Sequence, residues 1–205
     1  MLKACTALVI TLLSSQAMAQ TVVGGEDSIL TKGTRSIYIP AYRTFFGGEY
    51  KPAEQNLAML RELKPKVAPF KLADFTADDP DMATLVCRLS WPVHAPAELP
   101  YTLFLTGAMR NELSQEGLYA EDKGIEVTGR LDHFNFVSMG SPKWSITATF
   151  TVAGKEPVTI THETAFDSGW TAASACNAVN EKMVPAMQEF LLAVYSDPKF
   201  QALLQ

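Results

Sequence analysis

The sequence predicts an α+β fold in which two helices cover one face of a mainly antiparallel sheet, forming a two-layer sandwich. The main observation is that three strand-like segments follow one another, over residues 124–137, 143–153 and 156–166. Two segments with apolar residues at helical spacing flank them, at 101–116 and 172–194. With a further strand before the first helix, the predicted order is β-α-β-β-β-α.

Alternation and turns define the three consecutive strands. In the middle strand, apolar residues alternate with serine and threonine, which indicates one buried face and one outer face, either bare to solvent or half of an interface. The sequences at 139–142 and 153–156 favour tight hairpin turns. Between residues 125 and 137 the apolar positions change parity, which predicts a β-bulge near Asp132 and His133.

The remaining elements are bounded by proline and glycine. The first strand is predicted over residues 84–93, with Leu85, Cys87 and Leu89 on one face. The first helix of the sandwich is expected to end at Gly117. In the last helix, Pro185 is expected either to kink the helix or to divide it in two.

Residues 1–19 have the features of a secretory signal peptide. Lys3 supplies the positive charge, residues 8–13 form an apolar run, and Ala17-Met18-Ala19 fits a cleavage site after Ala19. No later segment approaches the twenty apolar residues of a membrane-spanning helix. The sequence therefore predicts a periplasmic protein with no transmembrane segment in its mature chain.

The mature chain is predicted to have two parts. Residues 20–81 form an irregular N-terminal extension with one short helix within 53–64, and residues 82–205 form the α/β sandwich domain. The extension is rich in large apolar residues, which form either a packing flap or a partner-binding segment. These residues are Ile37, Tyr38, Ile39, Phe45, Phe46 and Tyr50.

Charge and cysteine content narrow the class of protein. Removing Lys3 with the signal peptide changes the formal net charge from −5 to −6, and no basic cluster remains, which disfavours nucleic acid as a partner. Cys5 is removed with the same segment, leaving Cys87 and Cys176. A single cysteine pair in an exported protein predicts a disulfide, which stabilises a closed loop of this length by roughly 4 kcal/mol. A reactive thiol or a metal site is the alternative, but neighbouring ligands with suitable spacing are missing.

The stretch FDSGWTAASAC at 166–176 resembles fragments of a serine protease, but it does not meet the requirements of that mechanism. A chymotrypsin-like enzyme needs histidine after TAA, where this chain has Ser174, and needs its DSG sequence far downstream of that histidine. The three histidines lie in no recognisable catalytic motif. A pairing of Ser168 with His162 at one strand end is the basis of the remaining hydrolase hypothesis.

No catalytic, cofactor or metal site is predicted. His133 and His162 are interpreted as satisfied or solvent-facing strand residues, and the acidic segment 78–81 as a solvated turn without the spacing of a calcium loop. Glu112 and Glu116 of the first helix are interpreted as part of a solvent-exposed face. Phosphate-binding and dinucleotide-binding glycine patterns are absent from the sequence.

Several stretches of the chain share features with one known group of proteins. They are LVCRLSWPVHAP, VTGRLDHFNFVS, WSITATF and the segment from FDSGWTAASAC to SDPKF. Here the chain resembles functionally uncharacterised bacterial envelope proteins, many described as lipoproteins, with a CR strand and an AC helix. The pair Cys87 and Cys176 is the most specific part of this resemblance. The element order is also similar to lipopolysaccharide-transport lipoprotein-type modules.

These observations favour a non-enzymatic periplasmic protein, a binding or assembly module of the cell envelope. Its expected partner is an unknown envelope protein or a small apolar ligand, and no cofactor is expected. Two alternatives remain open: a carrier of a small, lipid-like ligand with a pocket between helix and sheet, and an unrecognised hydrolase.

Overall fold

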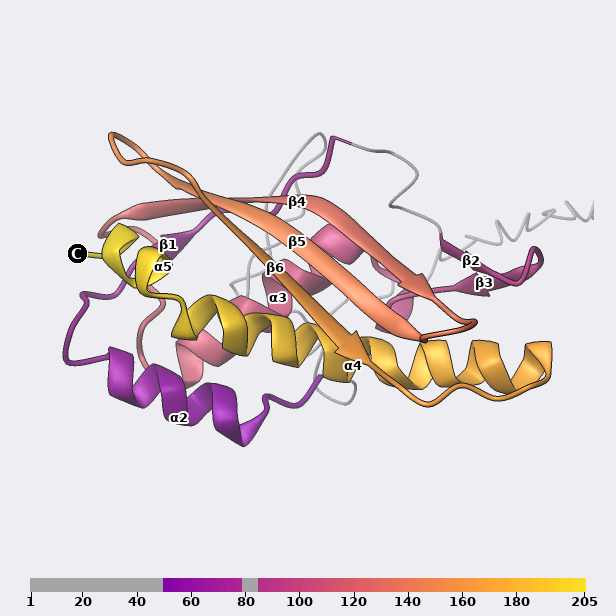
Figure 1. Cartoon of the computed structure of the whole chain (residues 1–205). Helices are drawn as coiled ribbons and strands as arrows, with labels where there is room; N and C mark the ends of the chain where they lie inside the picture. Colours follow the sequence, from indigo (N-terminus) through magenta and orange to yellow (C-terminus); the bar gives the residue numbers. More distant parts are fainter. Residues whose placement is uncertain (1–49, 79–84) are drawn as a thin grey trace, which may run out of the picture.

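The computed structural model describes residues 50–78 and 85–205 and confirms the predicted α+β class, with one face of a four-stranded sheet packed on helices (Figure 1). The strands lie in the order β1-β4-β5-β6, with β1 parallel to β4 and the other neighbours antiparallel. Their bounds are Lys71–Leu72 for β1, Glu126–Val137 for β4, Lys143–Val152 for β5 and Val158–Ala165 for β6.

The alternation in the central strand sets the two faces of the sheet. Apolar residues of β5 point inward and are buried, and Trp144 donates from Nε1 to the carbonyl of Val179 at 3.0 Å. On the outer face, threonine hydroxyls of β5 and β6 pair across the strands, for example Thr147 with Thr161 at 2.9 Å. The register between β4 and β5 shifts between Leu131 and His133, which confirms the predicted bulge.

Two long helices cover the inner face of the sheet, as predicted (Figure 1). The helices are α2 at Glu54–Leu63, α3 at Tyr101–Gln115, α4 at Ala172–Ser196 and α5 at Pro198–Leu203. The Tyr101 ring of α3 lies 4.5 Å from the Phe134 ring of β4, and α4 runs along β5 and β6. The short helix α2 packs against α3 and α4 from outside and adds Leu60 and Leu63 to the same core.

The prediction of one strand over residues 84–93 is wrong in detail. The segment forms two short antiparallel strands, β2 at Leu85–Cys87 and β3 at Trp91–Val93, in a sheet separate from the main one. Leu89 lies in the turn between them and is fully exposed instead of sharing a face with Cys87. The turn contains no glycine or asparagine, so the alternating pattern runs through it without a break. The fourth strand of the main sheet is β1, from the segment assigned to the extension.

Proline positions in the C-terminal part have different effects. Pro185 lies inside the continuous helix α4, so it does not divide that helix in two. The chain does break at Asp197, whose carboxylate caps α5 by accepting from the backbone N–H groups of Lys199 and Phe200. A short 3-10 turn, Pro96–Glu98, precedes α3.

A disulfide ties the separate hairpin to the main body. The Sγ atoms of Cys87 in β2 and Cys176 in α4 are 2.04 Å apart, across a sequence separation of 89 residues. Among the described residues, no helix is long and apolar enough to cross a membrane. The predicted signal peptide, the residues Ile37 to Phe46 of the extension, and Asp79 and Asp81 lie outside the described residues.

Candidate functional site

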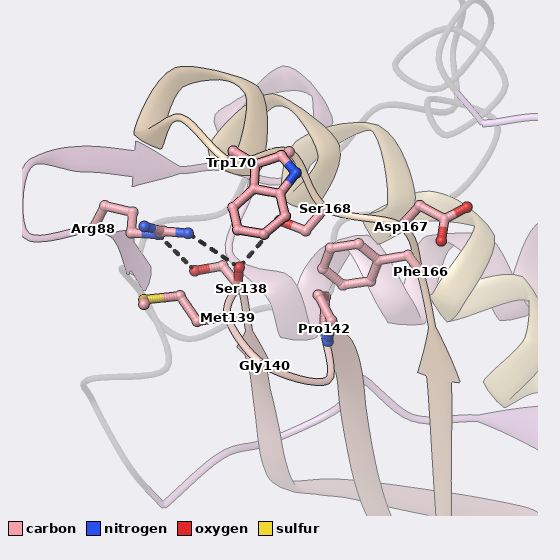
Figure 2. A pocket seen from close by; sticks show the side chains of 10 residues that line it. Arg88, Ser138, Met139, Gly140, Pro142, Phe166, Asp167, Ser168 and Trp170 are labelled. Atoms are coloured by element: carbon pink, nitrogen blue, oxygen red, sulfur yellow. Dashed lines mark hydrogen bonds between the residues drawn. The ribbon is translucent and has the colours of Figure 1, made fainter.

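Three chain segments meet at the end of the molecule where α4 begins (Figure 1). Ser138, in the β4–β5 turn, joins them (Figure 2). Arg88 of the β2–β3 turn donates from Nε to its Oγ and from Nη2 to its carbonyl, both at 3.3 Å, and Ser168 of the β6–α4 connection donates to the same carbonyl at 3.1 Å. We call this region the Arg88 end, which comprises residues 86–91, 137–142 and 166–171.

The hairpin turn at this end is strained. Arg88 and Leu89 have φ values of 50° and 72°, in the left-handed region that costs an L-residue about 1–2 kcal/mol each. Glycine and asparagine are the usual residues at such positions. The Cys87 disulfide and the Tyr101 hydroxyl, which donates to the Val93 carbonyl, fasten the hairpin to α4 and α3. Because the Leu89 side chain is 100% exposed, its own packing does not offset the strain.

The β6–α4 connection places a tryptophan on the outside. A Cβ atom at Gly169 would lie 2.0 Å from the Ser174 Oγ, so only glycine fits this approach to the first turn of α4. Thr171 caps that turn by accepting from the Ser174 backbone N–H at 3.1 Å. Trp170, between these two residues, is fully exposed. The protease-like stretch is therefore a strand-to-helix joint.

A pocket of about 390 Å³ opens between the three segments (Figure 2). Its larger apolar lining residues are Met139, Pro142, Phe166 and Trp170, and its polar ones are Arg88, Ser138, Asp167 and Ser168. In Figure 2 the guanidinium of Arg88 points toward Ser138, whereas the carboxylate of Asp167 lies on the opposite side, beyond Phe166. The two charged groups of the pocket are therefore on opposite rims.

The Arg88 end is the apolar part of the described surface. Six large apolar side chains of the described residues are exposed, and all six belong to this end. They are Val86, Leu89, Trp91, Val137, Met139 and Trp170. Single exposed apolar residues are ordinary, but a group of them indicates an interaction surface. Tryptophan, methionine and arginine are also the residue types enriched in protein interfaces.

Arg88 differs from the other described arginines in its charge partners. Arg61, Arg110 and Arg130 each pair with at least one carboxylate, at N···O distances of 2.7–3.1 Å. Arg88 forms no ion pair with any carboxylate in residues 50–78 or 85–205 and instead donates to Ser138. A guanidinium has five N–H donors. Within residues 50–78 and 85–205, Arg88 therefore has N–H donors beside the pocket that no side chain or carbonyl accepts.

The residues of the hydrolase hypothesis are engaged with other partners. His162 contacts the Glu189 carboxylate of α4 at 3.4 Å, and Ser168 donates to the Ser138 carbonyl. No histidine lines the pocket that contains Ser168. The structure therefore does not bring Ser168 and His162 together as a nucleophile and its base. In the described residues, no group of three metal-ligating side chains is found either, and Asp78 pairs with Arg130 at 3.1 Å.

A cluster of polar side chains lies in the interior, around Glu112. The sequence-based interpretation of Glu112 as part of a solvent-exposed face is therefore wrong. Glu112 is fully buried. Its carboxylate accepts from the Tyr50 hydroxyl at 2.5 Å, from Asn56 Nδ2 at 3.0 Å and from the Tyr195 hydroxyl at 2.8 Å. The prediction failed because α3 is buried on nearly all sides, so it has no broad solvent face at this position. We call these four residues the Glu112 junction.

Burial controls the ionisation of the Glu112 junction. Desolvation raises the pKa of Glu112 to about 6, against the opposing effect of its hydrogen bonds from Tyr50, Tyr195 and Asn56. Burial, together with the nearby Glu112 charge, also raises the pKa of both tyrosines well above the ordinary value. The tyrosines therefore remain hydrogen-bond donors. The junction connects α2, α3, α4 and the chain that leads into α2.

Comparisons with known proteins leave family and function unassigned. No family model matches the chain, and no curated protein matches it with significance. Among solved structures, a Xanthomonas campestris protein described by the family model DUF330 is similar with a TM-score of 0.40 and 14% identity, over 66% of this chain and 84% of that one. An uncharacterised protein is similar with a TM-score of 0.38 and 11% identity, over 63% of this chain and 88% of that one.

Similarity at this level supports no conclusion about activity. Neither description mentions a lipoprotein or lipopolysaccharide transport, so that part of the resemblance stays a prediction.

Proposed function

We propose that this chain is a non-enzymatic binding module of the bacterial envelope that contacts a partner protein through the Arg88 end. The observation that carries the proposal is the gathering of all six exposed large apolar side chains of the described residues at that one end. Leaving such side chains in water is unfavourable by roughly 25 cal/mol for each Å² of apolar surface. A partner that covers them recovers this free energy on binding.

The construction of the Arg88 end also supports a binding role. Hydrogen bonds to Ser138 hold together three loops from separate parts of the fold. A disulfide fastens one of them, the β2–β3 hairpin, which lies outside the main sheet. A surface arranged before binding loses less conformational freedom when the partner arrives. A disulfide also suits an exported protein, because such bonds persist in oxidising compartments such as the periplasm.

A carrier of a small, lipid-like ligand is the second candidate, and the interior gives it little support. The space between α4 and the sheet is filled by fully buried side chains, including Trp144, Phe150 and Phe190. The pocket of about 390 Å³ lies at the surface, and only two of the six exposed apolar residues line it, Met139 and Trp170. A small ligand in the pocket would leave the other four in water.

Site-specific photocrosslinking tests the proposal. A photoreactive phenylalanine analogue is placed at Leu89 or Trp170 of the full chain, and at Thr159 of the polar outer face as a matched control. We expect one adduct of the same mass from positions 89 and 170 in envelope extract, and none from position 159. The captured protein is identified by mass spectrometry and retested in purified form. Equal crosslinking from all three positions, or none from 89 and 170, would contradict the proposal.

A further inference from the structure

We propose that the pocket of the Arg88 end binds an acidic side chain, Asp or Glu, of a partner segment that also places an apolar side chain over Met139 and Trp170. This inference rests on the proposed function and names the chemistry of the partner. It starts from two features of the same pocket, an arginine without a described ion-pair partner and apolar walls beside it.

The guanidinium of Arg88 favours an acidic ligand. Its hydrogen bonds to Ser138 use Nε and Nη2, both at 3.3 Å, and Nη1 has no partner in the described residues. A planar guanidinium is matched by a carboxylate, which accepts two parallel N–H bonds. The two bonds to Ser138 also fix the orientation of the Arg88 group at the pocket rim, so less side-chain freedom is lost when the carboxylate binds.

The exposed apolar side chains around the pocket favour an acid that belongs to a protein segment. Val86, Leu89, Trp91 and Val137 extend the exposed apolar surface beyond the pocket on two of the three loops. A partner that buries this wider area while reaching Arg88 needs alternating acidic and apolar groups, as a polypeptide provides. A bilayer with anionic lipids is disfavoured, because recognition of its surface relies on several clustered Lys and Arg side chains. Arg88 is the one cationic side chain among the residues that line the pocket.

The strained turn is consistent with this role. The left-handed backbone at Arg88 and Leu89 presents both side chains at the pocket end of the hairpin, one to the pocket rim and one to solvent. Strained, non-glycine backbone often occurs at ligand-contacting positions. A turn with glycine at these positions would relieve the strain and remove both side chains from the surface.

The test is a peptide selection with the purified, disulfide-bonded mature chain. A phage-displayed random dodecapeptide library is selected against the wild-type protein, against Arg88→Gln, and against Arg130→Gln as a matched control from the outer face of the sheet. We expect peptides from the wild-type and Arg130→Gln selections to be enriched in Asp or Glu next to an aromatic or aliphatic residue. The Arg88→Gln selection should lose the acidic preference and keep the apolar one.

Affinities then give the size of the effect. For a synthetic copy of the highest-ranked wild-type peptide, Arg88→Gln should weaken binding by about 10- to 100-fold, the range expected for a charge-assisted hydrogen bond. Replacing the peptide acid by its amide should have the same effect, and the two changes together should add little. Near-UV circular dichroism checks that each variant keeps the native packing.

Three results would overturn the inference. One is a wild-type selection without acidic enrichment, and another is the same enrichment with Arg88→Gln. The third is wild-type binding to phosphatidylcholine or phosphatidylglycerol vesicles that is lost in Leu89→Ser or Trp170→Ser, which would assign the surface to a bilayer. If the selected peptides show no acidic preference but Leu89 and Trp170 still crosslink to one partner, this inference fails and the proposed function stands. If the crosslinking also fails, the proposed function fails as well.

Discussion

The Glu112 junction and the Arg88 end are each built around one charged side chain, and the partners of Glu112 and Arg88 distinguish a structural site from a candidate binding surface. At the junction, a buried carboxylate is met by three donors from the chain itself. At the Arg88 end, a cation has N–H donors without a partner among the described residues and lies beside exposed apolar side chains. A buried carboxylate whose hydrogen bonds are all made inside the fold belongs to the architecture, because its removal leaves buried donors without an acceptor. A cation without a described carboxylate partner beside an exposed apolar surface is the basis of the proposed binding function.

The largest expected effect is the loss of the junction carboxylate. Glu112→Ala leaves the donors of Tyr50, Asn56 and Tyr195 buried without an acceptor, so it should lower the free energy of unfolding by about 4 kcal/mol. Urea denaturation followed by circular dichroism measures this change. The control is Glu126→Ala, which removes an exposed ion pair with Lys71 and should cost less than about 1 kcal/mol. Equal effects of the two variants would show that the junction is not a stabilising unit.

The disulfide is expected to contribute slightly less to stability and to affect the Arg88 end as well. The double variant Cys87→Ser, Cys176→Ser should lose about 3 kcal/mol in the same denaturation measurement, since the unfolded chain regains the freedom of a long loop. This is below the roughly 4 kcal/mol of the chain-entropy model, because residual structure in the unfolded chain reduces the freedom regained. Crosslinking from Leu89 should weaken, because two three-residue strands alone hold a hairpin poorly. Thiol counting on unfolded, unreduced mature protein should find no free cysteine. Two reactive thiols would contradict the bond.

The pH dependence of stability reports the burial of Glu112. Its pKa is about 6 in the folded protein against an ordinary value of 4.5. The folded state therefore holds the proton more tightly, and the free energy of unfolding should fall as pH rises from 4.5 to 6, by about 2 kcal/mol, and then level off. Glu112→Gln, which does not titrate, is the control that removes contributions from other carboxyl groups. Parallel pH profiles for the wild-type protein and Glu112→Gln would show that the pH dependence of stability does not come from Glu112.

The smallest expected effect has the opposite sign. Leu89→Asn should raise the free energy of unfolding by about 1 kcal/mol, because asparagine tolerates the left-handed backbone and the leucine side chain is fully exposed. The same variant should weaken crosslinking from Trp170. Val137→Asn, at an exposed strand position with ordinary backbone, should give no gain in stability. A Leu89→Asn variant less stable than wild type would mean that Leu89 has a packing role.

Regular patterns in the sequence predicted most of the fold. Alternation in β5 and the parity change near Asp132 correctly predicted a half-buried sheet and its bulge, since a strand has a fixed period of two. The hairpin at 85–93 was missed because Arg88 and Leu89 occupy turn positions that usually carry glycine or asparagine. The strand β1 has two residues, too few to show any period.

The Glu112 junction and the Arg88 end were harder to predict, for different reasons. Glu112 depends on Tyr50, Asn56 and Tyr195, which lie 56–83 residues away along the chain, so no local pattern reports the junction. The Arg88 end did have a local signal. Leu89 and Trp170 are large apolar residues in connecting segments, where polar residues are usual, and this departure marks the surface. In the sequence, the stretch around Trp170 stands out for its likeness to a protease instead.

The most direct test of the account is a paired measurement on Arg88→Gln and Glu112→Gln. For each variant, the free energy of unfolding at pH 7 and the affinity for the highest-ranked acidic peptide are measured side by side. The account predicts that Arg88→Gln loses at least tenfold in affinity and less than about 1 kcal/mol in stability, since its bonds to Ser138 are long and partly exposed. Glu112→Gln should change stability and leave affinity unaltered. Unchanged affinity in Arg88→Gln, or a matching loss of affinity in Glu112→Gln, would contradict the separation of the two regions.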